Sequence, residues 1–161
     1  MSQTPAANLT WECSQLPTAA ESRAAIAAAF DTYSAELAQA GAVWEQKPEG
    51  SADGEAAWCA RQVAAHIASA GIFFGAGIAT ACGLEAPKLE RISLPDAGAA
   101  SSETRRTHGL LMEVVNKVSD EHLGIEFETP QLGKQTVASM LGVVSYHLND
   151  HANQLKTLRG G

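Results

Sequence analysis

Two histidines stand four residues apart in the segment SYHLNDHANQLKTL, residues 145–158. The segment contains neither proline nor glycine, so we expect a helix. On that helix His147 and His151 would project about 40° apart, with Cβ atoms roughly 6 Å apart. Two imidazoles at that separation can bind a single divalent ion. Taken alone, however, the pair is more typical of partly exposed polar residues on one side of a helix.

A third histidine strengthens the interpretation of His147 and His151 as metal ligands. His66 lies in the least polar part of the chain, residues 66–84, where a single histidine is usually a hydrogen-bonded core residue. Metal sites in helical bundles are built from side chains on facing helices, and two segments here can each direct histidine inward. The sequence therefore predicts a candidate metal site composed of His66, His147 and His151.

Four segments carry apolar residues at the steps of three and four that are typical of amphipathic helices. We expect them at about 19–40, 55–83, 102–123 and 136–158. The first begins with a capping box of Thr18 and Glu21, and the third is expected to be capped by Ser101 or Ser102. The expected inward residues are Ile26, Phe30, Tyr33 and Leu37; Trp58, Ile67, Ala70, Phe74 and Ile78; Leu111, Val114, Val115 and Val118; and Val137, Met140, Leu141, Val144, Leu148 and Leu155.

The segments between these helices show no convincing strand and no internal repeat. Residues 84–102 contain Pro87 and Pro95, so this connection should be long and irregular. Residues 124–135 could hold a short extended piece, limited by a proline and a glycine. The sequence thus predicts an all-α, antiparallel four-helix bundle with a long irregular connection between helices two and three, in one domain spanning 1–161.

The charge and cysteine content of the chain indicate which partners and which cellular compartment to expect. The 161 residues include 11 Lys and Arg against 18 Asp and Glu, a formal charge of −7, and no basic patch is present. Phosphate neutralisation drives most nucleic-acid affinity, so we expect no nucleic-acid partner. The three cysteines, Cys13, Cys59 and Cys82, are widely spaced and form no CxxC pair, which favours a reducing cytoplasm over a disulfide framework.

Export and membrane insertion are both disfavoured. The first residues, MSQTPAANLTWEC, lack the basic-then-apolar order of a signal peptide. Residues 66–84 carry no formally charged residue and approach the length of a spanning helix, but several polar residues and glycines dilute their hydrophobicity. A buried bundle helix with close backbone contacts at Gly71, Gly75 and Gly77 is the favoured interpretation, and no membrane partner is expected.

The motifs on the second and fourth helices resemble those of a known family. WCARQVAAHIA, with Trp58 eight residues before His66, resembles the W-S-x-x-x-x-x-x-H start of helix two in the DinB-like superfamily. HLNDHANQ is similar to its later H-x-x-x-H-x-x-Q, and the four expected helices agree in order. The resemblance implies a metal-binding bundle whose three ligands are His66, His147 and His151.

The same resemblance implies roles for neighbouring residues and a range of activities. Trp58 would be a packing anchor and Gln154 the polar residue after the second motif, whereas Cys59 replaces the usual Ser and Asn153 the usual Gly. The superfamily includes bacillithiol- and mycothiol-dependent transferases and maleylpyruvate isomerase. A low-molecular-weight thiol cosubstrate is therefore an expectation, while the two departures leave the subfamily open.

Three neutral imidazoles would leave a zinc, nickel or iron ion its full charge and an open coordination position. We expect an enzyme that transfers a thiol, performs a thiol-dependent isomerisation or hydrolyses a small electrophile. Asp150 and Gln154 are candidates to orient His151, although a solvated role suits Asp150 better. Cys59 could present a thiol near the site, but a small buried hydrophobe is its more typical role.

Two other classes of function remain open. The protein could be a non-catalytic bundle that binds a metal or small ligand, in which case the histidines would stabilise the fold without turnover. It could also be a module for helix-mediated dimerisation, and a homodimer is compatible with every alternative.

Overall fold

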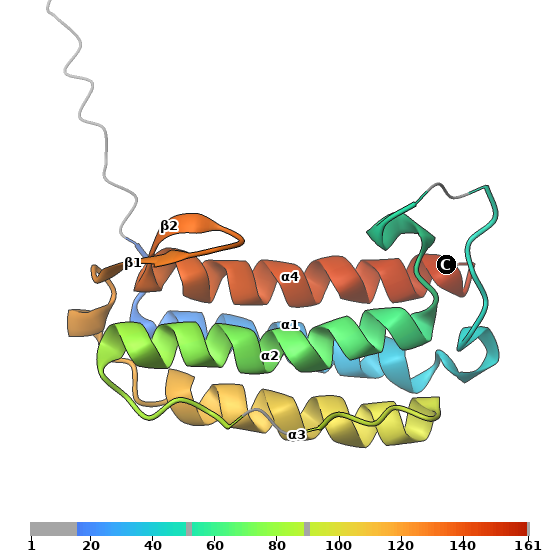
Figure 1. Ribbon diagram of the computed structural model, residues 1–161, viewed down its shortest axis with the longest axis horizontal. Coiled ribbons are helices and arrows are strands. Elements are labelled where there is room, and N and C mark those ends of the chain that lie inside the picture. Colours follow the sequence, from blue (N-terminus) through green and yellow to red (C-terminus); the bar gives the residue numbers. More distant parts are fainter. Residues whose placement is uncertain (1–15, 51–52, 89–90, 161) are drawn as a thin grey trace, which may run out of the picture.

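The computed structural model describes residues 16–50, 53–88 and 91–160, and its long elements are four helices (Figure 1). The expectations for Cys13 and for the N-terminal segment lie outside these residues. The all-helical class is confirmed, with one small sheet added. The elements are α1 (Ala19–Ala38), η1 (Gly41–Val43), η2 (Glu55–Ala57), α2 (Ala60–Cys82), α3 (Ala97–Val115), η3 (Asp120–His122), β1 (Glu126–Thr129), β2 (Gly133–Thr136) and α4 (Val137–Leu158).

The helices form two parallel pairs that run in opposite directions (Figure 1). Arg159, just after α4, contacts Glu36 near the end of α1, so α1 and α4 run the same way. In the second parallel pair, Gly71 of α2 lies against Thr107 of α3. Antiparallel packing therefore holds between the pairs and not within them. The parallel pairing of α2 with α3 is what requires a long connection.

That connection is shorter than expected because α3 begins earlier. Asp96 is the N-cap and its carboxylate accepts a hydrogen bond from the Ala99 amide at 2.8 Å, which satisfies one of the free amides of the first turn. Ser101 and Ser102, the predicted caps, lie within the helix. The described residues of the connection have no helix or strand, as predicted.

The predicted end of the third helix, near residue 123, is also wrong. The α-helix stops at Val115, and the chain turns so that Val118 is still buried. Asp120 then accepts a hydrogen bond from the Ala19 amide at 2.8 Å. The turn thus provides a partner for the amino terminus of α1, whose own capping box of Thr18 and Glu21 is present as predicted.

The second helix begins later than its predicted start near Glu55. Residues 55–57 form a single 3-10 turn, and Trp58 is extended. The Gln62 side chain accepts a hydrogen bond from the Cys59 amide at 3.0 Å, and Cys59 is the N-cap of α2. Trp58 therefore lies outside the helix, where its indole can fold over the histidines instead of following the helix surface.

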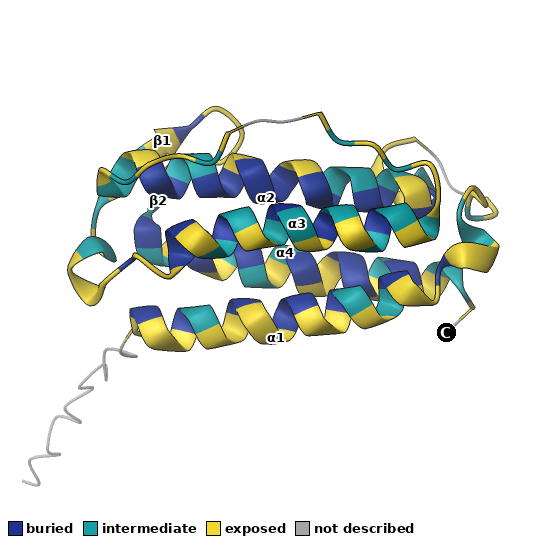
Figure 2. Ribbon diagram, turned by 90° about the horizontal axis from the view of Figure 1, so that it is seen from below, coloured by how far each residue is buried: buried dark blue, intermediate teal, exposed yellow. Residues whose placement is uncertain are grey.

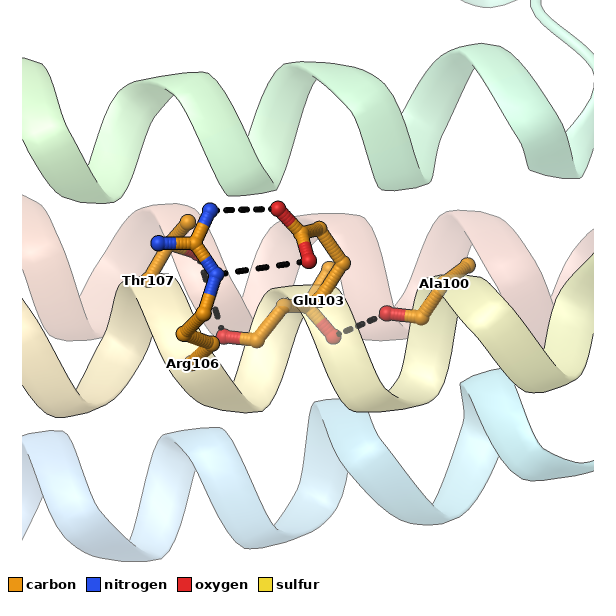
Figure 3. Close-up of polar contacts among 5 residues, drawn as sticks. Ala100, Glu103, Arg106 and Thr107 are labelled. Atoms are coloured by element: carbon orange, nitrogen blue, oxygen red, sulfur yellow. Dashed lines mark hydrogen bonds and ion pairs between the residues drawn. The ribbon is translucent and has the colours of Figure 1, made fainter. Parts of the chain in front are cut away.

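Glycines allow close packing around α2, as the sequence predicted. A Cβ on Gly71 would lie 3.6 Å from the Thr107 carbonyl oxygen, and one on Gly75 would lie 3.6 Å from the Leu111 Cα and 3.1 Å from Pro87. The facing side of α3 places threonine hydroxyls in this contact, and they donate to carbonyls of their own helix (Figure 3). Small residues and internally bonded hydroxyls thus bring α2 and α3 together without unpaired polar groups.

The expected short extended piece is half of an antiparallel hairpin. Thr129 pairs with Gly133 across a three-residue loop, and the Thr129 hydroxyl accepts a hydrogen bond from the Leu132 amide at 3.0 Å. Gly133 has a φ of +68°, the left-handed conformation that such loops require and that glycine adopts readily. Phe127 packs on Gly77 of α2, so the hairpin lies against the bundle.

The expected inward residues form the core (Figure 2). All of them are buried except Trp58, which is half-buried and packs against the core. The most apolar 18 residues of α2 have the length and composition of a membrane span, but 56% of them are buried inside the bundle. This is the pattern of a core helix in a globular bundle.

Two glycine-to-alanine substitutions should have opposite effects on stability. Gly133→Ala forces a side chain into the left-handed region and should lower the free energy of unfolding by about 1–2 kcal/mol. Gly142→Ala, on an exposed position of α4 with open space around it, should raise that free energy by about 0.5–1 kcal/mol. Urea denaturation measures both. A stabilising Gly133→Ala would contradict the hairpin geometry.

Candidate metal centre

The three histidines predicted as ligands converge from α2 and α4. The Nε2 atoms of His66 and His147 are 2.8 Å apart, and those of His147 and His151 are 3.2 Å apart. One ring nitrogen from each histidine lies within 4.8 Å of the others. The antiparallel crossing of α2 and α4 therefore brings together residues that are 81 positions apart in sequence.

The 2.8 Å and 3.2 Å separations between Nε2 atoms fit nitrogen ligands around one cation. At a metal–nitrogen distance of about 2.0–2.1 Å, two ligands are about 3.3 Å apart at a tetrahedral angle and about 2.9 Å at a right angle. Hydrogen bonding alone does not satisfy the cluster, because the His147 Nε2 faces two other ring nitrogens and can share only one proton. The donor set thus matches a divalent cation.

A glutamine fixes the orientation of His151. The Gln154 amide nitrogen donates to the Glu55 carbonyl oxygen at 2.6 Å, so its Oε1 is left facing the His151 Nδ1 at 2.7 Å. That oxygen can only accept, and the Nδ1 must therefore carry the proton of the neutral ring. The lone pair of His151 is then on Nε2, which points into the cluster. Gln154 is one of the two residues that the sequence offered as candidates to orient His151.

The surroundings of the cluster favour the neutral forms of His66 and His147. The Trp58 ring lies nearly parallel to His151, with centroids 6.3 Å apart, and Phe74 meets His147 edge-on at 5.4 Å. Burial, together with the neighbouring histidines, lowers the pKa of His147 to about 3. Burial and His151 also lower the pKa of His66. Neutral rings present free lone pairs at neutral pH, as a ligand set must.

The other two candidates do not join the cluster. Asp150 is exposed and, among the residues that the structure describes, its carboxylate makes no hydrogen bond or ion pair. Cys59 is 2% exposed at the amino terminus of α2, where it packs as a small core residue. Both observations agree with the simpler roles that the sequence suggested.

A cleft of about 490 Å³ opens beside the cluster. His66 and His147 form part of its wall, while His151 is 1% exposed and lies behind them. The remaining lining comes from α2, α4, the hairpin loop and the turn before α2: Glu55, Ser69, Ala70, Phe73, Phe74, Gln131, Leu132 and Val143. Two ring nitrogens of the candidate site are thus next to a space that can hold a small molecule.

The sequence profile of the DinB superfamily matches residues 41–155, which is most of the chain. The chain belongs to the DinB superfamily. No curated protein and no solved structure matches it. Membership of this superfamily, together with the histidine cluster, indicates that the protein binds a divalent metal.

Sequence reasoning about this DinB-superfamily chain missed the rest of the cleft. Phe73 and Val143 sit on helices at positions that could equally be solvent-facing, so periodicity did not single them out. Leu132 comes from the hairpin loop, and the pattern of two short runs separated by a proline and a glycine was the available signal. Only the packed hairpin shows that this loop reaches the histidines.

Gln154→Ala should weaken metal binding without unfolding the bundle. The variant removes the acceptor that holds the His151 proton on Nδ1, and the loss of such an orienting partner typically costs about 10–100-fold in metal affinity. Competition with a chromophoric chelator measures the zinc dissociation constant. Asn153→Ala is the matched control, since Asn153 is exposed one residue away, and equal effects of the two variants would contradict the assigned role.

The metal-free protein should lose stability in mild acid. Burial lowers the pKa of His66, of His147 to about 3 and of His108 to about 4, whereas unfolded histidine titrates near about 6.5. Below that pH the unfolded chain binds protons that the folded chain does not. These groups do not change the free energy of unfolding at pH values well above about 6.5. That free energy should fall as the pH drops from there toward 4.

Urea titrations in chelator at pH 7.5 and at about pH 5 test this expectation. His108→Phe is the informative variant, because His108 is stacked on Phe30 at 3.8 Å and a phenyl ring can keep that contact. It should reduce the loss of stability between the two pH values. A metal-free protein that is equally stable at both would refute the assignment.

Proposed function

We propose that the protein is a metal-dependent enzyme in which His66, His147 and His151 hold a divalent cation. It would act on a small electrophile by thiol transfer, thiol-dependent isomerisation or hydrolysis. The observation that carries the proposal is the convergence of three histidine Nε2 atoms, two of them from residues that line an open cleft. A closed structural site would instead have four protein ligands and no adjoining space.

The arrangement of the three ligands supports a catalytic metal site more than a metal-storage site. Three neutral imidazoles contribute no negative charge, so a bound cation keeps its full charge toward whatever occupies the cleft. When bound, it would supply Lewis acidity that lowers the pKa of a thiol or of water. Zinc, nickel and iron all suit nitrogen ligands, and the donor set is compatible with each.

The remaining parts of the site belong to the chain itself. Gln154 holds the His151 proton away from the cluster, and the Trp58 indole shields one side of the rings. Glu55 is the one carboxylate among the residues that line the cleft, so it is placed to accept a proton there. The apolar lining would limit the water that competes with a thiol.

A non-catalytic metal- or ligand-binding bundle is the second candidate. The cleft favours it in one respect, because besides the histidines its ionisable lining is limited to Glu55. In this case removal of the metal would lower the melting temperature and no thiol- or water-dependent reaction would depend on it. The enzyme proposal requires metal-dependent consumption of a thiol, or hydrolysis, in a substrate screen.

Protein prepared without a histidine tag should contain one divalent metal ion per chain. His147→Ala should reduce this content to well below half, because His147 contacts both other ligands in the cluster. His122→Ala is the control, since His122 lies in η3 and its ring accepts a hydrogen bond from the Ser119 amide instead. Elemental analysis gives the stoichiometry. A metal-free wild type that also fails to bind added zinc, nickel or iron would overturn the proposal.

A further inference from the structure

We infer that the cleft beside the histidines binds a neutral molecule with a substantial apolar group. The apolar group would contact Phe73, Leu132 and Val143, and the reactive end would lie toward His66 and His147. Such a molecule would be the substrate of the proposed enzyme, and this part of the inference rests on the proposed function. Binding of a neutral molecule in the cleft can be tested without the metal.

The rim of the cleft exposes apolar side chains that a folded protein usually covers. Phe73 is 38% exposed and Leu132 is 41% exposed, and these are two of the four large hydrophobic side chains that are exposed in the described part of the chain. The two lie on separate elements, α2 and the hairpin loop, and line the same space. Apolar residues gathered around a concave site are typical of small-molecule binding sites.

The charge of the cleft excludes strongly anionic ligands from its apolar end. Among the residues that the structure describes, no lysine or arginine lines the cleft, and Glu55 is the one acidic residue there. By contrast, a larger surface pocket of about 830 Å³ includes Lys47 in its lining, and a smaller one of about 270 Å³ includes Lys88 and Lys117. An anionic group placed near Phe73 and Leu132 would lose water without gaining a cationic partner, which is unfavourable.

The hairpin holds the apolar wall in position. Phe127 packs on Gly77 of α2, and the Thr129 hydroxyl closes the loop through the Leu132 amide. Leu132 therefore lines the same cleft as His66 and His147 from a loop that is held by these contacts. An apolar wall held by the protein's own contacts should bind a suitable neutral probe with no metal present.

A pair of fluorescent probes that differ by one sulfonate tests the inference. N-phenyl-1-naphthylamine is neutral, and 8-anilinonaphthalene-1-sulfonate has the same aromatic framework with one negative charge. The neutral probe should bind the metal-free, full-length protein saturably and with blue-shifted emission. The sulfonate should bind at least about tenfold more weakly, a difference of about 1.4 kcal/mol. Equal or tighter binding of the sulfonate would overturn the inference.

Matched lysine substitutions locate the probe. Leu132→Lys adds a cation at the rim, so it should weaken the neutral probe several-fold and strengthen the sulfonate. Tyr146→Lys makes the same kind of change at an α4 residue that is 72% exposed and does not line the cleft, and it should change neither affinity. Both positions are on the surface, so both variants should fold. Equal responses of the two variants would place the probe elsewhere and refute the inference.

Zinc titration of the same preparations separates this inference from the proposed function. Zinc binding without saturable binding of the neutral probe would overturn the inference and leave the metal site standing. Probe binding without affinity for zinc, nickel or iron would support the apolar cleft and overturn the metal-dependent enzyme.

Discussion

The constraint on which the rest of the structure depends is the placement of three neutral imidazoles between two helices of an apolar bundle. Their ring nitrogens face one another at hydrogen-bonding distance, yet one proton cannot satisfy all three. The site is stable as a ligand set only if each ring is held in one orientation and kept unprotonated. Burial lowers the pKa of His66 and His147, and Gln154 fixes the orientation of His151.

The topology leaves the histidines accessible on one side. Glycines and threonines draw α2 and α3 into close parallel contact, and the long connection needed for that pairing runs along them. The opposite side of α2 faces α4, where the histidines lie. There the hairpin loop supplies one wall of the cleft, so that the fold combines a tightly packed seam on one side of α2 with a binding space on the other.

Helical interiors could be predicted well because burial follows a simple period, and Ile26, Leu141 and Leu155 are buried as expected. Helix ends were predicted less well because several nearby residues can act as caps. Asp96, and not Ser101, is the N-cap of α3. At the start of α2, the Cys59 amide donates a hydrogen bond to the Gln62 side chain. The choice among such caps depends on where the packed core requires the helix to begin, and local sequence does not contain that information.

The sequence by itself determined the class of fold and the three candidate ligands, and it offered Gln154 as one of two candidates to orient His151. It could do so because helical period and the four-residue spacing of His147 and His151 are local properties. Only the tertiary structure decided the parallel pairing of the helices, the contact between Gln154 and Glu55, and the cleft formed with Leu132. Those features join residues distant in sequence, and their geometry follows from packing between elements.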